Sequence, residues 1–193
     1  KNGAFHYLVK GDDNDKLIPT VSQAVERAGQ NIPVSKKTRT FDSITGRSPA
    51  IQQAIALAKK VAPTGATVLL TGATGTGKEV FANAIHDASG RSERSFVAVN
   101  CAALSRELIE SELFGHVAGA FTGAVKDKKG LIDAAKGGTL FLDEIGELSA
   151  ELQAKLLRVL ETGDYLRVGD TKPLKADVRL IAATHRDLSK EIG

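Results

Sequence analysis

Residues 68–85 read VLLTGATGTGKEVFANAI: an apolar run, a glycine-rich turn and then a helical pattern. Gly72, Gly77 and Lys78 have the spacing G-x-x-x-x-G-K of a phosphate-binding loop. Glycines let the backbone turn its N–H groups towards one point, and the following helix adds the partial positive charge of its N-terminus. Lys78 would supply a point charge for the β- and γ-phosphates of a nucleotide. The stretch therefore predicts a nucleotide site, with an ordinary glycine-rich turn between strand and helix as the alternative.

The residue after Lys78 departs from the general motif. Glu79 stands where a Ser or Thr hydroxyl usually holds magnesium. A carboxylate there changes the charge near the phosphates, so it either turns away from them or meets the metal through water. We expect Asp143 to dominate metal binding.

A second motif, which ends in two acidic residues, lies at the end of a predicted strand in GGTLFLDE (residues 137–144). An apolar strand that ends in two adjacent acids is the usual partner of a phosphate-binding loop. Asp143 would hold Mg²⁺ directly or through water, and Glu144 would orient and polarise the attacking water. A capping Asp-Glu pair is the alternative for a strand end taken alone. Together with the phosphate loop, the pair predicts hydrolysis rather than binding only.

Composition limits the class of protein. The chain has 193 residues, 42% of them apolar and 25% charged, which fits one domain or one domain with a fragment attached. A net charge of +3 is too small to indicate nucleic-acid binding. Cys101 is the only cysteine, so we expect no disulfide framework and a reducing compartment such as the cytoplasm. No apolar stretch approaches the roughly 18 residues of a membrane span.

Strands and helices alternate along most of the chain. Apolar runs predict strands at 68–70, 96–99, 139–142 and 178–183, and apolar stripes at helical spacing predict helices at 51–61, from 104 to 114 and at 152–160. Ser48 and Pro49 are typical of a helix start. This alternation indicates a three-layer α/β domain with a mainly parallel central sheet.

The N-terminal part has a different character. Residues 1–29 predict one strand and one helix, which are too few to make a core alone, and residues 30–40 are polar and basic like a linker. The start lacks both a signal peptide and an initiator Met, so we expect an internal piece of a longer protein. The strand and helix resemble the end of a response-regulator receiver domain, which implies that Lys10 contacts a phosphorylated aspartate outside this chain. A strand edge with a solvated lysine is the alternative.

A glycine-rich hexapeptide breaks the helical pattern that begins near residue 104. Residues 119–124, GAFTGA, set Phe121 and Thr122 between small residues, so a helix cannot run well through them. An aromatic side chain exposed on such a loop is unfavourable unless it finds a partner surface. Composition alone leaves two possibilities open: Phe121 meets a partner, or it folds back into the core.

Four motifs in this order decide the family. GAFTGA, the GTGKE phosphate loop, GGTLFLDEIGEL and LQAKLLRVLE resemble the AAA+ domain of sigma-54-dependent transcription activators, over residues 41–193. Glu79 is that family's normal residue. The resemblance implies an AAA+ fold of the P-loop NTPase class, truncated here before the helical lid, within a two-component response regulator.

The resemblance also implies roles for individual residues. The ATP phosphates would lie on Gly72, Ala73, Thr74, Gly75, Thr76, Gly77, Lys78 and Glu79, and the adenine near Ile44 and Gly46. Asn100 would hold Glu144 in an inactive orientation, and Thr184 would sense the γ-phosphate, with His185 following where Asn is common. The sigma-54 contact would be made by Gly119, Ala120, Phe121, Thr122, Gly123 and Ala124, supported by a second loop at 163–176.

The implied activity is ATP-driven remodelling of the closed complex of sigma-54 RNA polymerase holoenzyme. The family's other partners would be a hexameric or heptameric ring of copies, promoter and enhancer DNA through a domain absent from this chain, and a cognate sensor kinase. The family's arginine fingers, lid and DNA-binding domain follow the position of Gly193, so we expect these 193 residues alone to bind ATP weakly and barely hydrolyse it. A generic AAA+ unfoldase or assembly factor, or a catalytically incomplete nucleotide-binding fragment, are the alternatives.

Overall fold

The computed structural model describes residues 41–186, apart from the side chains of Arg106 and Glu107. The predicted receiver fragment (1–29) and linker (30–40) lie outside the described residues, so those domain boundaries stay predictions. Within the described part, no helix is long and apolar enough to cross a membrane.

A parallel sheet forms the centre of the described part. Its four strands run in the order β1 (Val68–Thr71), β8 (Arg179–Thr184), β5 (Thr139–Asp143) and β2 (Phe96–Asn100). All three pairings are parallel. The four strands predicted within the described residues are present to within one residue at either end, and the prediction of a mainly parallel α/β sheet is confirmed.

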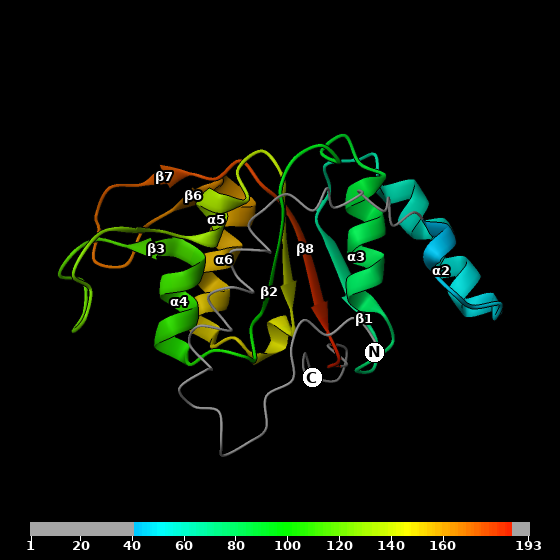
Figure 1. The fold of residues 1–193 in the computed structure, drawn as a ribbon, viewed down its shortest axis with the longest axis horizontal. Helices are drawn as coiled ribbons and strands as arrows, with labels where there is room; N and C mark the ends of the chain where they lie inside the picture. Colours follow the sequence, from blue (N-terminus) through cyan, green and yellow to red (C-terminus); the bar gives the residue numbers. More distant parts are fainter. Residues whose placement is uncertain (1–40, 187–193) are drawn as a thin grey trace, which may run out of the picture. The chain divides into compact units, whose positions relative to one another are not determined.

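Helices cover both faces of the sheet (Figure 1). On one face lie α2 (Pro49–Val61) and α3 (Lys78–Asp87); on the other lie α4 (Arg106–Phe114), α5 (Leu131–Ala134) and α6 (Ala150–Thr162). Because neighbouring side chains of a strand point to opposite faces, Phe141 joins the core under α2 and α3, whereas Leu140 and Leu142 join the core under α4 and α6. The central strands β5 and β8 are therefore apolar without alternation, as a doubly covered parallel sheet requires.

Helix ends follow local chemistry. The Ser48 hydroxyl accepts from the N–H of Ile51 at 3.4 Å, with Pro49 in the first turn, and this starts α2. The other end of α2 is held from a distance, because the buried Arg179 guanidinium of β8 donates to the carbonyls of Val61 and Ala62 at 3.0 and 2.7 Å. Helix α6 ends at Gly163, whose φ of 74° suits a glycine.

Two short antiparallel pairs carry the loops and were not predicted. They are β3 (Gly115–His116) with β4 (Lys128–Lys129), and β6 (Asp164–Tyr165) with β7 (Leu174–Lys175). Two residues are too few for a periodic pattern, and the same holds for the 3-10 turns η1 (Phe41–Ser43) and η2 (Ile145–Glu147).

Candidate functional site

Polar residues meet at the carboxyl edge of the sheet. The strand register places Thr71 beside Thr184 and Asn100 beside Asp143, and each of the four is the last residue of its strand. Because parallel strands all end at this edge, residues far apart in sequence gather there. Open α/β sheets bind ligands in this position.

The phosphate loop leaves β1 and enters α3 at the same edge. Gly75 and Gly77 have φ values of 81° and 86°, a region that favours glycine, and Gly77 directly precedes the first residue of α3. The Lys78 ammonium donates to the carbonyls of Gly72 and Ala73 at 3.0 and 3.3 Å, so its charge lies at the mouth of the loop. Glu79 is exposed on the first turn of α3. The predicted strand–loop–helix geometry is confirmed.

Glu144 lies opposite this loop in an unusual backbone conformation. Among the described residues it is the only non-glycine residue with positive φ, at 53° with ψ 48°. That conformation costs roughly 1–2 kcal/mol for a residue with a side chain, and such strain concentrates at functional sites. The N–H of Glu144 donates to Asp143 Oδ1 at 3.1 Å, so the two acids are also joined locally.

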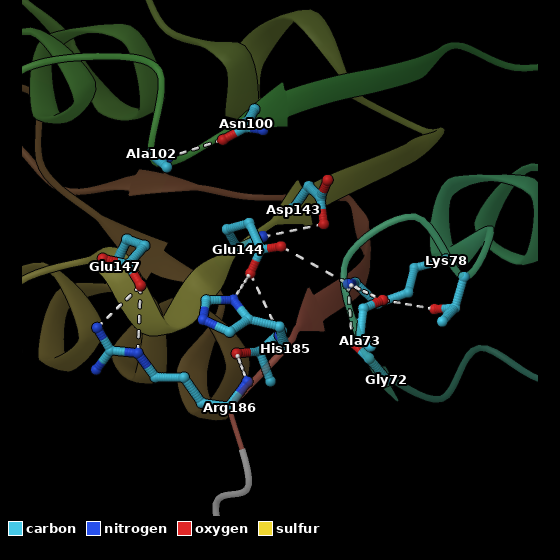
Figure 2. Close-up of polar contacts among 12 residues, drawn as sticks. Gly72, Ala73, Lys78, Asn100, Ala102, Asp143, Glu144, Glu147, His185 and Arg186 are labelled. Carbon is cyan, nitrogen blue, oxygen red and sulfur yellow. Dashed lines mark hydrogen bonds and ion pairs between the residues drawn. The ribbon is translucent and has the colours of Figure 1, made fainter.

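The carboxylate of Glu144 is approached from two sides (Figure 2). Its Oε1 lies 3.6 Å from Lys78 Nζ, and both side chains are largely buried, 13% and 8% exposed. Its Oε2 accepts from His185 Nδ1 at 2.6 Å and from the N–H of His185 at 3.2 Å. The His185 hydrogen bonds, followed in effect by the charge of Lys78, hold the pKa of Glu144 below its usual 4.5 despite its desolvation. Glu144 is therefore ionised at neutral pH.

The predicted contact between Asn100 and Glu144 is not present. The Asn100 side-chain oxygen accepts instead from the N–H of Ala102 at 2.9 Å, a local turn that follows β2. The reason is proximity in sequence: an Asn carbonyl two residues before a free N–H forms this bond readily. In the described part of the chain, His185 and Lys78 take the place at Glu144 that Asn100 was expected to have.

Thr184 is buried next to this group. Its hydroxyl accepts from the N–H of Arg186 at 3.1 Å. Gly146 lies against it, since a Cβ there would be 3.1 Å from the Thr184 hydroxyl and 2.9 Å from Arg186 Cδ. Arg186 also pairs with Glu147 of η2 at 2.9 Å. The sequence did not point to Gly146, Glu147 or Arg186, although Arg186 is only the second residue after the strand that carries Thr184.

An apolar cavity of about 600 Å³ opens beside the phosphate loop. Its lining includes Gly72, Thr76 and Lys78 from the loop region and apolar residues of α2, β1 and α3. Ile44 and Gly46, the residues predicted near the adenine, do not line it. Gly46 nevertheless lies against Ile51, which does line the cavity, because a Cβ on Gly46 would be 3.0 Å from an Ile51 methyl.

The acids at this edge suit a metal ion that is held mainly by the phosphates of a bound nucleotide. Among residues 41–186, no group of three or more His, Cys, Asp or Glu side chains could hold an ion. Mg²⁺ commonly takes one or two carboxylates together with substrate phosphates and water. Asp143, half-buried and with one oxygen engaged by Glu144, fits that requirement as a single protein ligand.

The hexapeptide 119–124 forms a hydrogen-bonded loop between β3 and β4. The N–H of Gly119 donates to the carbonyl of Ala124 at 2.8 Å, which closes its base, and Ala124 is buried. Phe121 is 43% exposed and packs edge-on against the ring of His116, with 5.0 Å between ring centroids. Thr122 is exposed. Phe121 is therefore neither buried in a core nor fully exposed. Its position is intermediate between the two possibilities that composition left open, contact with a partner and burial in the core.

One protein family and two characterised relatives match most or all of the chain. The sequence profile described as the sigma-54 interaction domain matches residues 44–193. The chain is 52% identical over 182 residues to the Nif-specific regulatory protein of Rhodobacter capsulatus, covering 94% of this chain and 30% of that protein. It is 47% identical over 193 residues to the transcriptional regulatory protein GlrR of Escherichia coli, covering 100% and 43%.

A solved structure shares the fold. NtrX from Brucella abortus, crystallised in complex with ATP, matches with a TM-score of 0.70 and 37% identity over 98% of this chain and 43% of that chain. Its complex with ADP matches with a TM-score of 0.71. The chain spans less than half the length of each of these relatives.

Proposed function

Because the chain belongs to the sigma-54 interaction domain family, we propose that it binds and hydrolyses ATP to remodel the sigma-54 RNA polymerase holoenzyme. One observation carries the proposal: Lys78 of the phosphate loop and Glu144 of the acidic pair lie 3.6 Å apart at the carboxyl edge of the sheet. A phosphate-binding cation and an ionised carboxylate side by side are what an attack of water on a phosphoryl group needs.

The chemistry follows from these residues. The backbone N–H groups of residues 72–79 and the Lys78 ammonium would bind the phosphates, and the apolar cavity would receive the base. As water attacks the γ-phosphorus, its oxygen forms the new O–P bond and the bond to the ADP oxygen breaks. The water proton passes to the Glu144 carboxylate, which is ionised and therefore able to accept it. Mg²⁺, held by Asp143 and the phosphates, would supply positive charge against the phosphate oxygens.

The solved relative supports the choice of nucleotide, since NtrX was crystallised with ATP and with ADP. Thr184 lies at the same edge, and we assign to it the sensing of the γ-phosphate. Asn100 is proposed to approach Glu144 only in another step of the cycle, since its oxygen here is bound to Ala102.

The partner surface is proposed to be the loop 119–124. Phe121 and Thr122 are exposed there, and backbone hydrogen bonds within the loop hold its shape. We assign these two side chains to the sigma-54 contact, with residues 163–176 as the supporting loop. The ring assembly, the DNA contact and the sensor kinase are proposed for the longer protein to which such a domain belongs.

The test is nucleotide binding by the 193-residue chain, followed with a fluorescent ATP analogue and competed with ATP. Lys78→Ala should weaken binding at least about tenfold, because the phosphates lose their charged partner. Lys60→Ala, an exposed lysine of α2, is the matched control and should bind as the parent chain does. Equal binding by Lys78→Ala and the parent would contradict the proposal. An ATP-dependent pulldown of purified sigma-54 then separates this function from a generic unfoldase.

A further inference from the structure

Residue His185 makes two contacts with one atom of the Glu144 carboxylate. Its Nδ1 lies 2.6 Å from Oε2 and its backbone N–H lies 3.2 Å from the same oxygen. An ionised carboxylate can only accept hydrogen bonds, so Nδ1 must carry the proton. His185 therefore binds Oε2 with two donors, one of them a side chain that a substitution can remove.

The second oxygen of Glu144 has a different partner. Oε1 faces the ammonium of Lys78 at 3.6 Å. A γ-phosphate at the loop would compete for that same ammonium, because a phosphate oxygen offers it more negative charge. Once Lys78 turns to the phosphate, Oε1 is released for a water molecule while Oε2 stays on His185.

We propose that His185 is the positioning residue for Glu144: it anchors Oε2 so that Oε1 can take the proton of the attacking water. The inference rests on the proposed ATP hydrolysis and adds to it the residue that orients the water-activating carboxylate. Catalytic bases are commonly held in this way by a third group.

The geometry distinguishes two conservative substitutions. An Asn amide nitrogen can occupy nearly the position of Nδ1, whereas a Gln amide nitrogen lies nearer the position of Nε2, further along the ring. Only Nδ1 contacts Glu144. His185→Asn should therefore keep the anchoring hydrogen bond, and His185→Gln should lose it. The backbone donor remains in every variant, so the loss should be partial.

The experiment measures single-turnover hydrolysis of ATP by the longer, ring-forming protein that contains this domain, with the protein in excess, together with its Kd for ATP. His185→Ala should lower the rate about tenfold to a hundredfold, a typical loss for a partner that orients a reacting group, with Kd changed less than about threefold. His185→Asn should restore most of the rate and His185→Gln should not. An unchanged rate in His185→Ala, or equal recovery by Asn and Gln, overturns the inference.

A second measurement does not depend on turnover. Nitrogen-15 spectra of the imidazoles should show Nδ1 of His185 carrying a proton in the parent chain and losing that preference in Glu144→Ala. No difference between the two would also overturn the inference. If Lys78→Ala binds and hydrolyses ATP as the parent does, the proposed function fails instead, whereas the His185 spectra still report the contact with Glu144.

Discussion

Ala120 and Gly169 lie in contact across the two loops of the domain. A Cβ added to Gly169 would stand 2.6 Å from the Cβ of Ala120 and 3.0 Å from its Cα. Around this point, the N–H of Val117 donates to the carbonyl of Val168 at 3.1 Å, and the N–H of Val168 donates to the carbonyl of Gly115 at 2.9 Å. The segment 163–176 is thus joined to the stem of the Phe121 loop by backbone hydrogen bonds, and the close approach of Ala120 leaves no room for a side chain at position 169.

Replacement of Gly169 by Ala should separate the two loops. The added methyl group meets Ala120, so we expect faster hydrogen exchange at the amides of Val117 and Val168, measured by mass spectrometry of peptides covering both. Gly163→Ala is the matched control, since its φ of +74° is similar to the +79° of Gly169 but its nearest neighbour would be 3.6 Å away. Equal exchange in the two variants would contradict the steric argument.

Removal of the Phe121 ring should affect binding more than folding. The side chain is 43% exposed and its ring contact is with His116, so Phe121→Ala should lower the free energy of unfolding by only about 1 kcal/mol. Under the proposed function, the same variant should lose ATP-dependent capture of sigma-54. Val125→Ala, 89% exposed just beyond the hexapeptide, is the control. Full capture by Phe121→Ala would refute the assignment of this loop.

Asp143 should account for the dependence on magnesium. Under the proposed function, Asp143→Ala should remove the stimulation of nucleotide binding and turnover by Mg²⁺, because Asp143 supplies the one carboxylate that would hold the ion beside the phosphates. A titration of Mg²⁺ against bound fluorescent nucleotide measures this. Asp177→Ala, an exposed acid paired with Arg91, should respond to Mg²⁺ as the parent does. A retained magnesium response in Asp143→Ala would be the contrary result.

The buried Arg179 should be important for stability. It is 2% exposed, its guanidinium donates to the carbonyls of Val61, Ala62 and Ala66, and burial lowers its pKa. Arg179→Met keeps the aliphatic part but leaves these carbonyls without their donor, so the free energy of unfolding in urea should fall by about 3 kcal/mol. Arg94→Met, at an exposed arginine, should change it by less than about 0.5 kcal/mol. A loss below about 1 kcal/mol at Arg179 would mean that the carbonyls find other donors.

Cys101 should make the protein less stable in alkali. Burial, and then the charge of Asp143, raise the pKa of its thiol from 9.0 to about 12. Above pH 9 the unfolded chain loses this proton while the folded chain keeps it, so the free energy of unfolding falls with rising pH by up to about 1.4 kcal/mol per unit until about pH 12. Cys101→Ala should show a shallower decline between pH 9 and 11, whereas parallel curves would exclude the thiol as the cause.

The parts of the site that depend on neighbouring residues could be predicted from the amino-acid sequence. The turn from β1 into α3 needs glycines at 75 and 77, and Lys78 follows them along the chain. The acids Asp143 and Glu144 are adjacent at a strand end, and an alternation of strands and helices was enough to predict the layers. These features follow from local backbone preferences and hydrophobic periodicity, which a single sequence displays directly.

The contacts between side chains that are distant in the sequence depend on the folded structure. His185 lies 41 positions from Glu144, and only the pairing of β8 with β5 brings the two together. Asn100, at the same edge, bonds instead to a neighbour two residues away, and Gly169 contacts Ala120 because two short strand pairs align their loops. Such contacts depend on register, rotamer and competition among hydrogen-bond partners. None of these has a periodic signature in the sequence.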